Sequence, residues 1–437
     1  MKITVLAMVL IGLMMSGCGK LPVGPDEEGW RSVQKRELLT ILKEDRYASL
    51  CNDGTLLERV EESGDSKLMT KLLVNYANHL ANGCIDIAHF KASQRAKRRK
   101  KIETSYDLNI EKVSAEEIHN KIKAGESIDA ILKPYVPKVP QYLQLLKRYK
   151  AMQSDANISL RILKKVRLNL ERTKLMKSDL GKDYVLINIP EFMVRLIEDN
   201  ATVLKFRVIV GKTNMQTPIF SERMRYVEIN PQWNVPDSIM RKSYISRIQA
   251  NPAWVKAKGM ELHKASYDLR SPKVDPASVD WSKYPKDGKG YIPYKLVQVP
   301  SLRNGLGRVK FIFPNKHAVY MHDTQAKSLF KRKTRCFSHG CIRLGKPVDL
   351  LNYITTHYSK YSTQTVKKWY DSLKTSHLIL NRKLWVHTVY LTAYVEESGE
   401  VKLFHDVYGF DDSQRLIFDV EKERHLPLKK EEKPQED

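Results

Sequence analysis

The stretch of sequence that decides the fold reads SHGCIRL at residues 338–344, and HDT at residues 322–324 precedes it. A β-rich run ends at the HDT segment and a helical spacing begins at Pro347, so we expect a sharp turn around the cysteine. A nearby imidazole makes a cysteine nucleophilic by taking its proton and lowering the pKa of the thiol. Glycine beside the sulfur lets backbone N–H groups converge on an oxyanion. The stretch therefore predicts acyl transfer through a thioester on Cys341.

Three other roles for these residues compete with catalysis. Zinc would need three or four ligands, and the sequence offers the pair no CxxC or HxxxH partner. Cys336 lies close before Cys341, so the two cysteines could form a disulfide. A single cysteine or histidine is also more often structural than catalytic. The extended spacing of the motif favours catalysis over this last role.

The spacing His-x15-Ser-His-Gly-Cys-x-Arg resembles the signature of the YkuD-type L,D-transpeptidases. The resemblance extends over residues 178–410, where further motifs resemble the larger, YcbB-like branch of that family. The segment NLER at 169–172 also resembles the helix that precedes the catalytic domain in this branch. The further motifs, individually weak and jointly specific, are NIP at 188–190, RVIVG at 207–211, QTP at 216–218, NPQWNVP at 230–236, AVYMHDT at 318–324, KSLF at 327–330 and YG at 408–409.

The resemblance implies a role for each residue of the motif. Cys341 would be the acylated nucleophile and His322 its general base. A backbone carbonyl orients the base in this family, which places that role on the main chain of Asp323. His339 would shape the pocket and support the turn. The backbone N–H groups of Gly340 and Cys341 are the candidates for the oxyanion hole.

Other positions match residues that lie near the bound substrate in the family, namely Tyr320, Ser338, Arg343 and Trp233. Cys336 stands where relatives commonly have a small residue, so packing is its simplest role.

The family also implies a reaction, for which no metal or other cofactor is needed. The donor would be a tetrapeptide stem of peptidoglycan, which loses D-Ala and becomes joined to a second stem in a 3→3 cross-link. Water as acceptor would make the protein an L,D-carboxypeptidase, and a protein lysine would make it an anchoring enzyme for lipoproteins. A different class remains possible, a non-catalytic wall-binding scaffold lipoprotein. A carbapenem, as a strained acyl donor, is expected to add covalently to Cys341.

The N-terminus predicts export. A lysine and an apolar stretch precede the small residues at 16–17, which together predict a signal peptide over residues 1–17. The small residues before Cys18 resemble a bacterial lipobox, so we expect this cysteine to carry lipid. The protein would then lie in the bacterial envelope, in the periplasm, anchored to a membrane as a lipoprotein. Export makes nucleic acid an unlikely partner.

The spacing of apolar residues divides the chain. Helical periodicity predicts an N-terminal helical region over 18–177, of unassigned function, and β-rich runs predict the catalytic domain over 178–410. The fold class is therefore α+β. An insertion over about 238–300 resembles a capping subdomain that could hold the acceptor. Residues 411–437 are predicted to be a C-terminal tail that is disordered after Phe418.

The amino-acid composition, above all the net charge, indicates what kind of molecule the protein binds. The 437 residues carry 75 Lys and Arg against 50 Asp and Glu, a net charge of +25, and 42% are hydrophobic, which excludes wholesale disorder. The charge predicts an anionic partner, either peptidoglycan stems or a membrane surface. A basic run at 95–101 is either a solvated helix face or a contact for such a polymer. Five cysteines are too few for a disulfide scaffold, although export permits one between Cys51 and Cys84.

Overall fold

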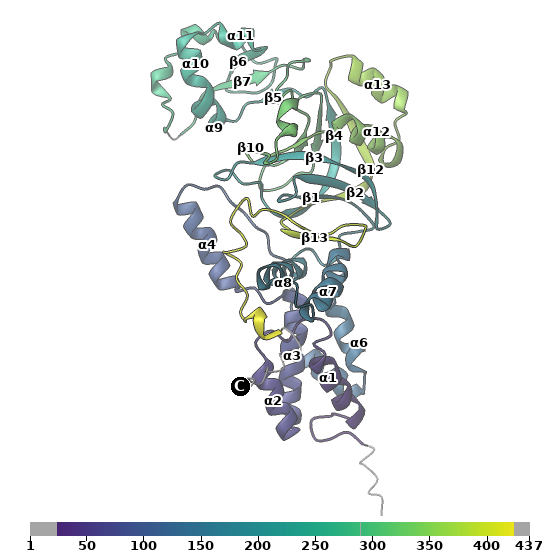
Figure 1. Ribbon diagram of the computed structural model, residues 1–437. Coiled ribbons are helices and arrows are strands. Elements are labelled where there is room, and N and C mark those ends of the chain that lie inside the picture. Colours follow the sequence, from purple (N-terminus) through teal and green to yellow (C-terminus); the bar gives the residue numbers. More distant parts are fainter. Residues whose placement is uncertain (1–23, 289, 424–437) are drawn as a thin grey trace, which may run out of the picture. The chain divides into compact units, whose positions relative to one another are not determined.

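The protein is described by a computed structural model that covers residues 24–288 and 290–423 (Figure 1). The predicted signal peptide at 1–17 and the predicted lipid site at Cys18 lie outside the described residues. Among the helices that are described, none is long and apolar enough to cross a membrane.

Two compact units make up the chain. Among the described residues, one consists of 24–79 and 112–136, and the other of 80–111 and of 137–423 apart from 289. This division differs from the boundary at residue 177 that helical periodicity suggested. The reason is that two stretches of the helical region pack with the β-rich part of the chain.

The first unit is helical, as the spacing of its apolar residues predicts. Leu72, Leu73 and Tyr76 are fully buried on one face of a helix. The Gln34 side-chain amide donates to the carbonyls of Ile122 (3.1 Å) and Glu126 (2.7 Å), which joins the first helix to the end of a later one. The helices are α1 (Ser32–Lys43), α2 (Gly54–Ser63), α3 (Ser66–Asn82), which crosses the unit boundary, α5 (Ala115–Ala124) and α6 (Ile128–Leu132), followed by the short η1 (Lys133–Tyr135).

A mixed β-sheet forms the centre of the second unit. Its strand order is β10-β3-β11-β9-β8-β4-β12-β1-β2, and β2 also pairs with β3, so the sheet closes on itself. Inward-facing apolar side chains of these strands fill one continuous core. The strands are β1 (Asp183–Asn188), β2 (Met193–Glu198), β3 (Ala201–Gly211), β4 (Phe220–Ile229), β8 (Val309–Ile312), β9 (Met321–His322), β10 (Cys336–Ser338), β11 (Ile342–Leu344) and β12 (Ser376–Val389).

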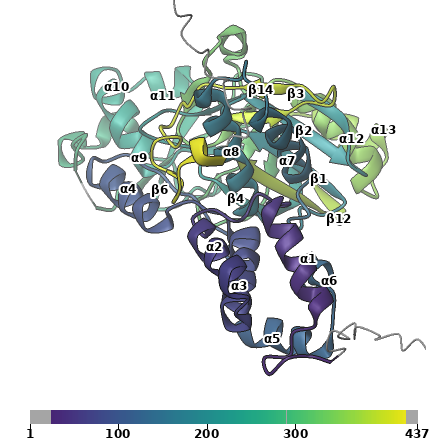
Figure 2. The ribbon, with the colours of Figure 1, turned by 60° about the horizontal axis from the view of Figure 1, so that its bottom comes forward.

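Helices cover two sides of this sheet. The helix α12 (Pro347–Tyr358) packs on β12 and β8 and is followed by α13 (Thr363–Asp371). On another side, α7 (Pro140–Gln153) and α8 (Leu160–Lys174) pack on the β13 hairpin strand (Ala393–Val395) (Figure 1). Figure 2 shows α7 and α8 lying over the strands. The predicted fold class, α+β with the β-rich domain after a helical region, is confirmed.

The helix α8 carries the NLER segment and buries it completely. Asn169 accepts a hydrogen bond from the Thr392 N–H (2.7 Å) and donates to the Thr392 hydroxyl (2.9 Å). Arg172 donates to Gln414 (2.7 Å) and forms an ion pair with Asp411 (2.8 Å). Buried polar groups need such partners, so this segment fixes the C-terminal part of the chain to the sheet.

The described C-terminal segment is therefore not a tail, contrary to the prediction for 411–437. Gln414 and Val420 are buried, and Glu423 forms an ion pair with the buried Arg167 (3.0 Å). The sequence was misleading because its many charges suggested solvent exposure, whereas several of them have buried partners. Residues 424–437 lie outside the described part.

The insertion forms a small subdomain with its own core. Three short strands, β5 (Trp233–Asn234), β7 (Tyr294–Gln298) and β6 (Met260–Lys264), pair in that order. A nearly continuous helical stretch, α9 (Asp237–Ile239), η2 (Met240–Tyr244) and α10 (Ile245–Ala250), packs on them. Figure 1 shows these elements with α11 (Trp254–Ala257) grouped together beside the main sheet.

The segment after α4 (Ile87–Arg99) lies along the loop between β3 and β4. Glu103 pairs in parallel with Met215, and Tyr106 with Ile219. The Tyr106 ring packs edge-on against Phe90 and Phe410 in the main core. This part of the predicted helical region is thus fastened to the catalytic domain.

Candidate active site

The turn that carries Cys341 connects β10 to β11 and is held by Ser338. The Ser338 hydroxyl accepts a hydrogen bond from the Gly340 N–H (3.1 Å) and donates one to the Cys341 carbonyl (2.5 Å). Thr217 donates to the Gly340 carbonyl (2.8 Å) from the β3–β4 loop. Gly340 has φ = +110°, a conformation that side chains disfavour. The glycine is therefore required by the shape of the turn.

The register of the strands brings the predicted base next to the cysteine turn. The strands β9 and β11 are parallel neighbours, with Met321 opposite Ile342 and His322 opposite Arg343. The Ile342 N–H donates to the Tyr320 carbonyl (3.1 Å) directly after the cysteine. His322 and Cys341, 19 positions apart in the sequence, thus lie at neighbouring strands of the sheet.

His322 is held in one tautomer by the backbone. Its ring is buried, with 5% of the residue exposed, and Nδ1 is hydrogen-bonded to the main-chain carbonyl of Asp323. A carbonyl can only accept, so Nδ1 carries the proton and donates it. Nε2 then has the lone pair, and this nitrogen is the one able to accept a proton. The carbonyl that the family resemblance assigned to this role is in place.

The Asp323 side chain has a separate structural role. Its carboxylate accepts hydrogen bonds from the N–H groups of Arg308 (2.9 Å) and Thr324 (2.7 Å) and pairs with Lys327. Gly307, at φ = +67°, makes room for it, because a Cβ there would lie 2.2 Å from a carboxylate oxygen. The carboxylate fixes the loop that contains the orienting carbonyl.

Burial keeps the resting pair neutral. It lowers the pKa of His322 to about 4, and the Arg343 guanidinium adds to this effect. Burial also raises the pKa of the Cys341 thiol, against the opposing effects of Tyr320, Lys310 and Arg343. The sequence suggested a lowered thiol pKa, but desolvation outweighs the neighbouring donors and cations. The resting site therefore holds a thiol and an imidazole, not an ion pair.

Tyr320 is the polar partner of the thiol. Its backbone and its side chain both lower the pKa of the Cys341 thiol, so both favour the thiolate. The Tyr320 ring also lies 5.6 Å from the His322 ring, centre to centre. Sequence reasoning placed this tyrosine near the substrate, and the structure brings it to the nucleophile itself.

A pocket of about 320 Å³ opens over the cysteine. Of the predicted residues, Cys341, His339, Tyr320 and Trp233 line it. The segment that leads into the inserted subdomain supplies one wall through Pro236, Ser238, Ile239 and Lys242. The remaining described residues that line the pocket are Glu103, Met215, Asn234, Leu306, Lys310 and Ala318.

Three predicted residues are placed differently from the expectation. Ser338 braces the turn and does not line the pocket. The Gly340 N–H, a candidate oxyanion donor, is engaged by that serine. Arg343 also does not line the pocket, and its buried Nε has no partner among the described residues. The guanidinium acts on the site through its charge, which lowers the pKa values of both Cys341 and His322.

Lys310 is a pocket residue that sequence reasoning missed. It lies directly opposite His322 in the pairing of β8 and β9. Its Nζ is 4.6 Å from the centre of the Tyr320 ring and 3.3 Å from a Glu228 carboxylate oxygen. The signal that could have revealed it is a lysine within the apolar strand run VKFIF at 309–313.

Cys336 and Cys341 are both free thiols, so the possible disulfide between them is absent. Cys336 packs against the main core, and burial raises its pKa to about 11. Packing is therefore the role that its surroundings support.

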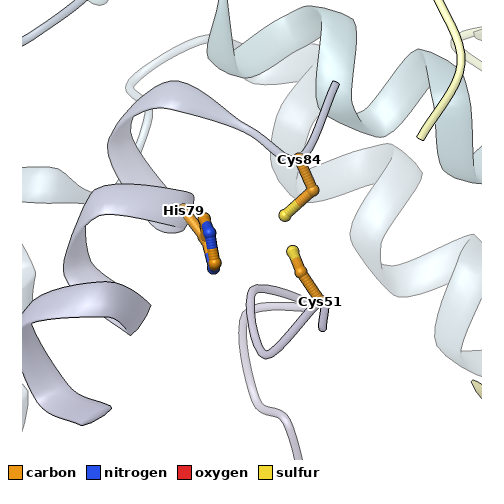
Figure 3. Close-up of side chains that lie close together, drawn as sticks. All are labelled: Cys51, His79 and Cys84. Atoms are coloured by element: carbon orange, nitrogen blue, oxygen red, sulfur yellow. The ribbon is translucent and has the colours of Figure 1, made fainter. Parts of the chain in front are cut away.

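A second cysteine group lies at the end of α3. Figure 3 shows Cys51, His79 and Cys84 close together, and their possible ligand atoms lie within 4.8 Å of one another. Cys51 and Cys84 are disulfide-bonded. Zinc binds cysteine as thiolate, so the oxidised group offers a metal only the imidazole.

The fold and the site define the class of protein. Residues 182–368 match the YkuD family, described as the L,D-transpeptidase catalytic domain. The YkuD catalytic domain predicted from the sequence is thus confirmed for these residues, and the YcbB-like branch stays a prediction.

Relatives agree with this class. A protein of Haemophilus influenzae named "Putative L,D-transpeptidase" is 29% identical over 271 residues, which is 62% of this chain and 52% of that protein. The chain thus spans about half the length of the curated relative that it matches.

Two solved structures were also matched at low identity. One is an L,D-transpeptidase from Mycobacterium smegmatis (12% identity, 47% of this chain and 58% of that chain, TM-score 0.20). The other is described as the Ldtfm-avibactam carbamoyl enzyme (9% identity, 68% and 98%, TM-score 0.21).

Proposed function

We propose that the protein is a peptidoglycan L,D-transpeptidase of the YcbB-like branch, which forms 3→3 cross-links through a thioester on Cys341. The observation that carries this proposal is the pocket over Cys341 together with the imidazole of His322, which the Asp323 carbonyl holds on the neighbouring strand. Such an arrangement supports a nucleophile and a base with a fixed tautomer. The YkuD match of residues 182–368 supports the same chemistry.

The first half-reaction forms the acyl-enzyme. The Cys341 sulfur attacks the carbonyl carbon that joins the third residue of a tetrapeptide stem to its terminal D-Ala. The thiol proton passes to Nε2 of His322, and the carbonyl oxygen becomes an oxyanion that the Cys341 N–H could bind. The C–N bond then breaks, His322 returns the proton to the leaving nitrogen, and D-Ala departs.

The second half-reaction transfers the acyl group. The side-chain amine of another stem attacks the thioester carbon and gives a proton to His322. The C–S bond breaks, and the sulfur takes up the proton again. The product is an amide between the two stems, and the enzyme returns to its neutral pair.

Tyr320 lowers the barrier to the first attack. As the thiol loses its proton, the Tyr320 N–H and hydroxyl can hydrogen-bond the developing thiolate. The positive charges of Lys310 and Arg343 act in the same direction. These groups compensate for the desolvation of the sulfur at the moment when charge develops.

Transfer to an amine is favoured over hydrolysis by the inserted subdomain. Residues 236–242 form a wall of the pocket, which limits access of water to the thioester. Release of a tripeptide alone would identify the protein as an L,D-carboxypeptidase.

The cellular setting belongs to the same proposal. A signal peptide at 1–17 and lipid on Cys18 would place the enzyme in the periplasm, attached to a membrane. The net charge of +25 would favour a wall rich in carboxylates and an anionic membrane surface.

The test uses purified tetrapeptide muropeptides with the wild-type protein and the Cys341→Ala variant, followed by mass spectrometry. Loss of D-Ala together with a cross-linked dimer, in wild type alone, is the expected result. Unchanged substrate with the wild-type protein would refute the enzymatic proposal.

A further inference from the structure

A second pocket, of about 480 Å³, also borders the catalytic turn. It touches His339 and Gly340 but not Cys341. It shares Glu103, Lys242 and His339 with the pocket over the cysteine. A molecule bound here would therefore lie next to the pocket over the cysteine, against the turn that carries the nucleophile.

Most of one wall comes from residues 98–105, which lie outside the YkuD match. This wall is fixed in place, because the Glu103 N–H donates to the Asn214 carbonyl (2.9 Å) and the Gln216 N–H donates to the Glu103 carbonyl (2.8 Å). Lys97, in the last turn of α4, donates to the carbonyls of Tyr408 and Gly409. The basic run is thus held against the catalytic domain on one face.

The other face of the basic run points its charges into the pocket. Arg98 and Lys101 line it, and their side chains make no hydrogen bond or ion pair with any described residue. Lys242 adds a third cation from the inserted subdomain, 4.0 Å from the Glu103 carboxylate. Arg98 and Lys101, two cations without a described partner, would attract a carboxylate here.

A buried polar atom without a partner also lines this pocket. Gln216 is only 6% exposed, and its Oε1 accepts no hydrogen bond from the described residues. Buried acceptors normally have a donor, and a bound ammonium or amide N–H would supply it. The Glu103 carboxylate offers a second acceptor for a positive group.

We propose that this second pocket binds the acceptor peptide of the transfer. Arg98, Lys101 and Lys242 hold the carboxylate of its amine-bearing residue, and Gln216 and Glu103 hold its N–H groups. This inference rests on the proposed function, since it names the site of the second substrate. It assigns substrate binding to a part of the chain that the family match does not include.

A third pocket extends the cationic surface along α4. It shares Arg98 and Ser105 with the second pocket, and Lys91 and Arg95 also line it. Gln94, 6% exposed, places a buried Nε2 without a described partner in its wall. The rest of an anionic acceptor chain would follow this surface, with Gln94 donating to a carbonyl.

The chain offers a matched pair of variants for the test. Arg98→Glu reverses a charge inside the pocket, whereas Arg99→Glu reverses the neighbouring charge, which lines none of the three pockets. Both arginines are exposed, and their side chains form no ion pair or hydrogen bond with the described residues. Neither substitution therefore removes an internal interaction. Lys101→Glu provides a second reversal within the pocket.

Cross-linked dimer is measured by mass spectrometry at saturating donor while the concentration of acceptor tetrapeptide is varied. Arg98→Glu and Lys101→Glu are expected to raise the half-saturating acceptor concentration about tenfold or more, the usual value of a charge-assisted hydrogen bond. Arg99→Glu should stay within about twofold of wild type, as for a surface charge without a partner. An acceptor with this carboxylate amidated should bind wild type weakly and lose its sensitivity to Arg98→Glu.

Acyl-enzyme formation is followed separately by intact protein mass with a carbapenem. The acceptor site would be overturned if Arg98→Glu and Lys101→Glu both formed the acyl-enzyme and showed the same half-saturating acceptor concentration as wild type. That result would leave the proposed function intact. Equal effects of Arg98→Glu and Arg99→Glu would also overturn it, because they would indicate only long-range attraction. Absence of acyl-enzyme in wild type would refute the proposed function and this site with it.

Discussion

The imidazole of His322 donates its Nδ1 proton to the carbonyl of the next residue, Asp323, so that the carboxylate of Asp323 takes no part in orienting the base. The side chain instead holds the loop through two backbone N–H groups and Lys327. Because a backbone carbonyl orients the His322 ring, substitution of a partner side chain does not remove this hydrogen bond. Substitutions at these two positions should therefore have different effects.

Asp323→Asn should act mainly on stability. The amide can accept fewer hydrogen bonds from Arg308, Thr324 and Lys327, and each buried N–H left without a partner costs roughly 1–3 kcal/mol. Urea unfolding is expected to show a decrease of that order in the free energy of unfolding. His322→Ala should abolish carbapenem acylation with a much smaller change in stability. Equal loss of acylation in the two variants, per folded molecule, would contradict this division of roles.

The acid limb of the pH–rate profile should lie far below the ordinary pKa of histidine. Acylation needs neutral His322 to accept the thiol proton, and protonation removes this ability as the pH falls through its pKa of about 4. Activity should therefore persist at pH 5.5. Arg343→Met removes a neighbouring cation, so the pKa of His322 rises and the acid limb moves to higher pH.

Arg332→Met, which changes an exposed arginine in the loop before β10, is the control for that experiment. Its acid limb should coincide with that of wild type. If the acid limb of the wild-type pH–rate profile lay near pH 6.5, the His322 imidazole would be solvated. That result would contradict the prediction, which rests on the burial of this ring.

Tyr320→Phe should make the thiol harder to ionise. The variant lacks the hydroxyl whose effect lowers the pKa of the Cys341 thiol, although the backbone effect of residue 320 remains. The pKa of the thiol should rise further, and acylation should slow about tenfold or more, as for a lost hydrogen bond to a charged group. The pH dependence of iodoacetamide alkylation measures the first effect. Tyr353→Phe, which removes a hydroxyl bonded to Glu198 (2.8 Å) far along α12, should leave both unchanged.

Ser338→Ala should misplace the nucleophile. Both the Gly340 N–H and the Cys341 carbonyl lose their partner, so the turn loses what fixes its conformation. Acylation by a carbapenem is expected to slow about tenfold or more, because small errors in the position of reacting atoms are costly. Ser359→Ala removes a hydroxyl bonded to the Thr355 carbonyl at the end of α12 and serves as the control. Unaltered acylation in Ser338→Ala would show that the turn is rigid without its serine.

The catalytic pair could be predicted from the sequence because its evidence is local. The HDT and SHGC segments each combine a strand with a functional residue, and the glycine before Cys341 indicates the turn. Alternation of apolar residues likewise indicates the strands whose inward faces form the core. These patterns can be interpreted without knowing which strands pair with each other.

Residues that depend on pairing could not be predicted in this way. Lys310 faces His322 only because β8 and β9 pair in that register. The thiol pKa rises because burial, which a local motif does not reveal, outweighs the neighbouring charges. The segment 411–423 misled prediction for the same reason, since the buried partner of Glu423 lies in a distant helix, α8.

The pairing of residues 103–107 with the β3–β4 loop has a practical consequence for anyone who works with fragments of this protein. A piece cut at the limits of the family match would lose the Tyr106 ring from the core and the NLER helix that binds the C-terminal segment. It would also lack one side of the cleft beside the nucleophile. The compact unit that contains the catalytic turn therefore begins near residue 80, about a hundred residues before the first residue of the family match.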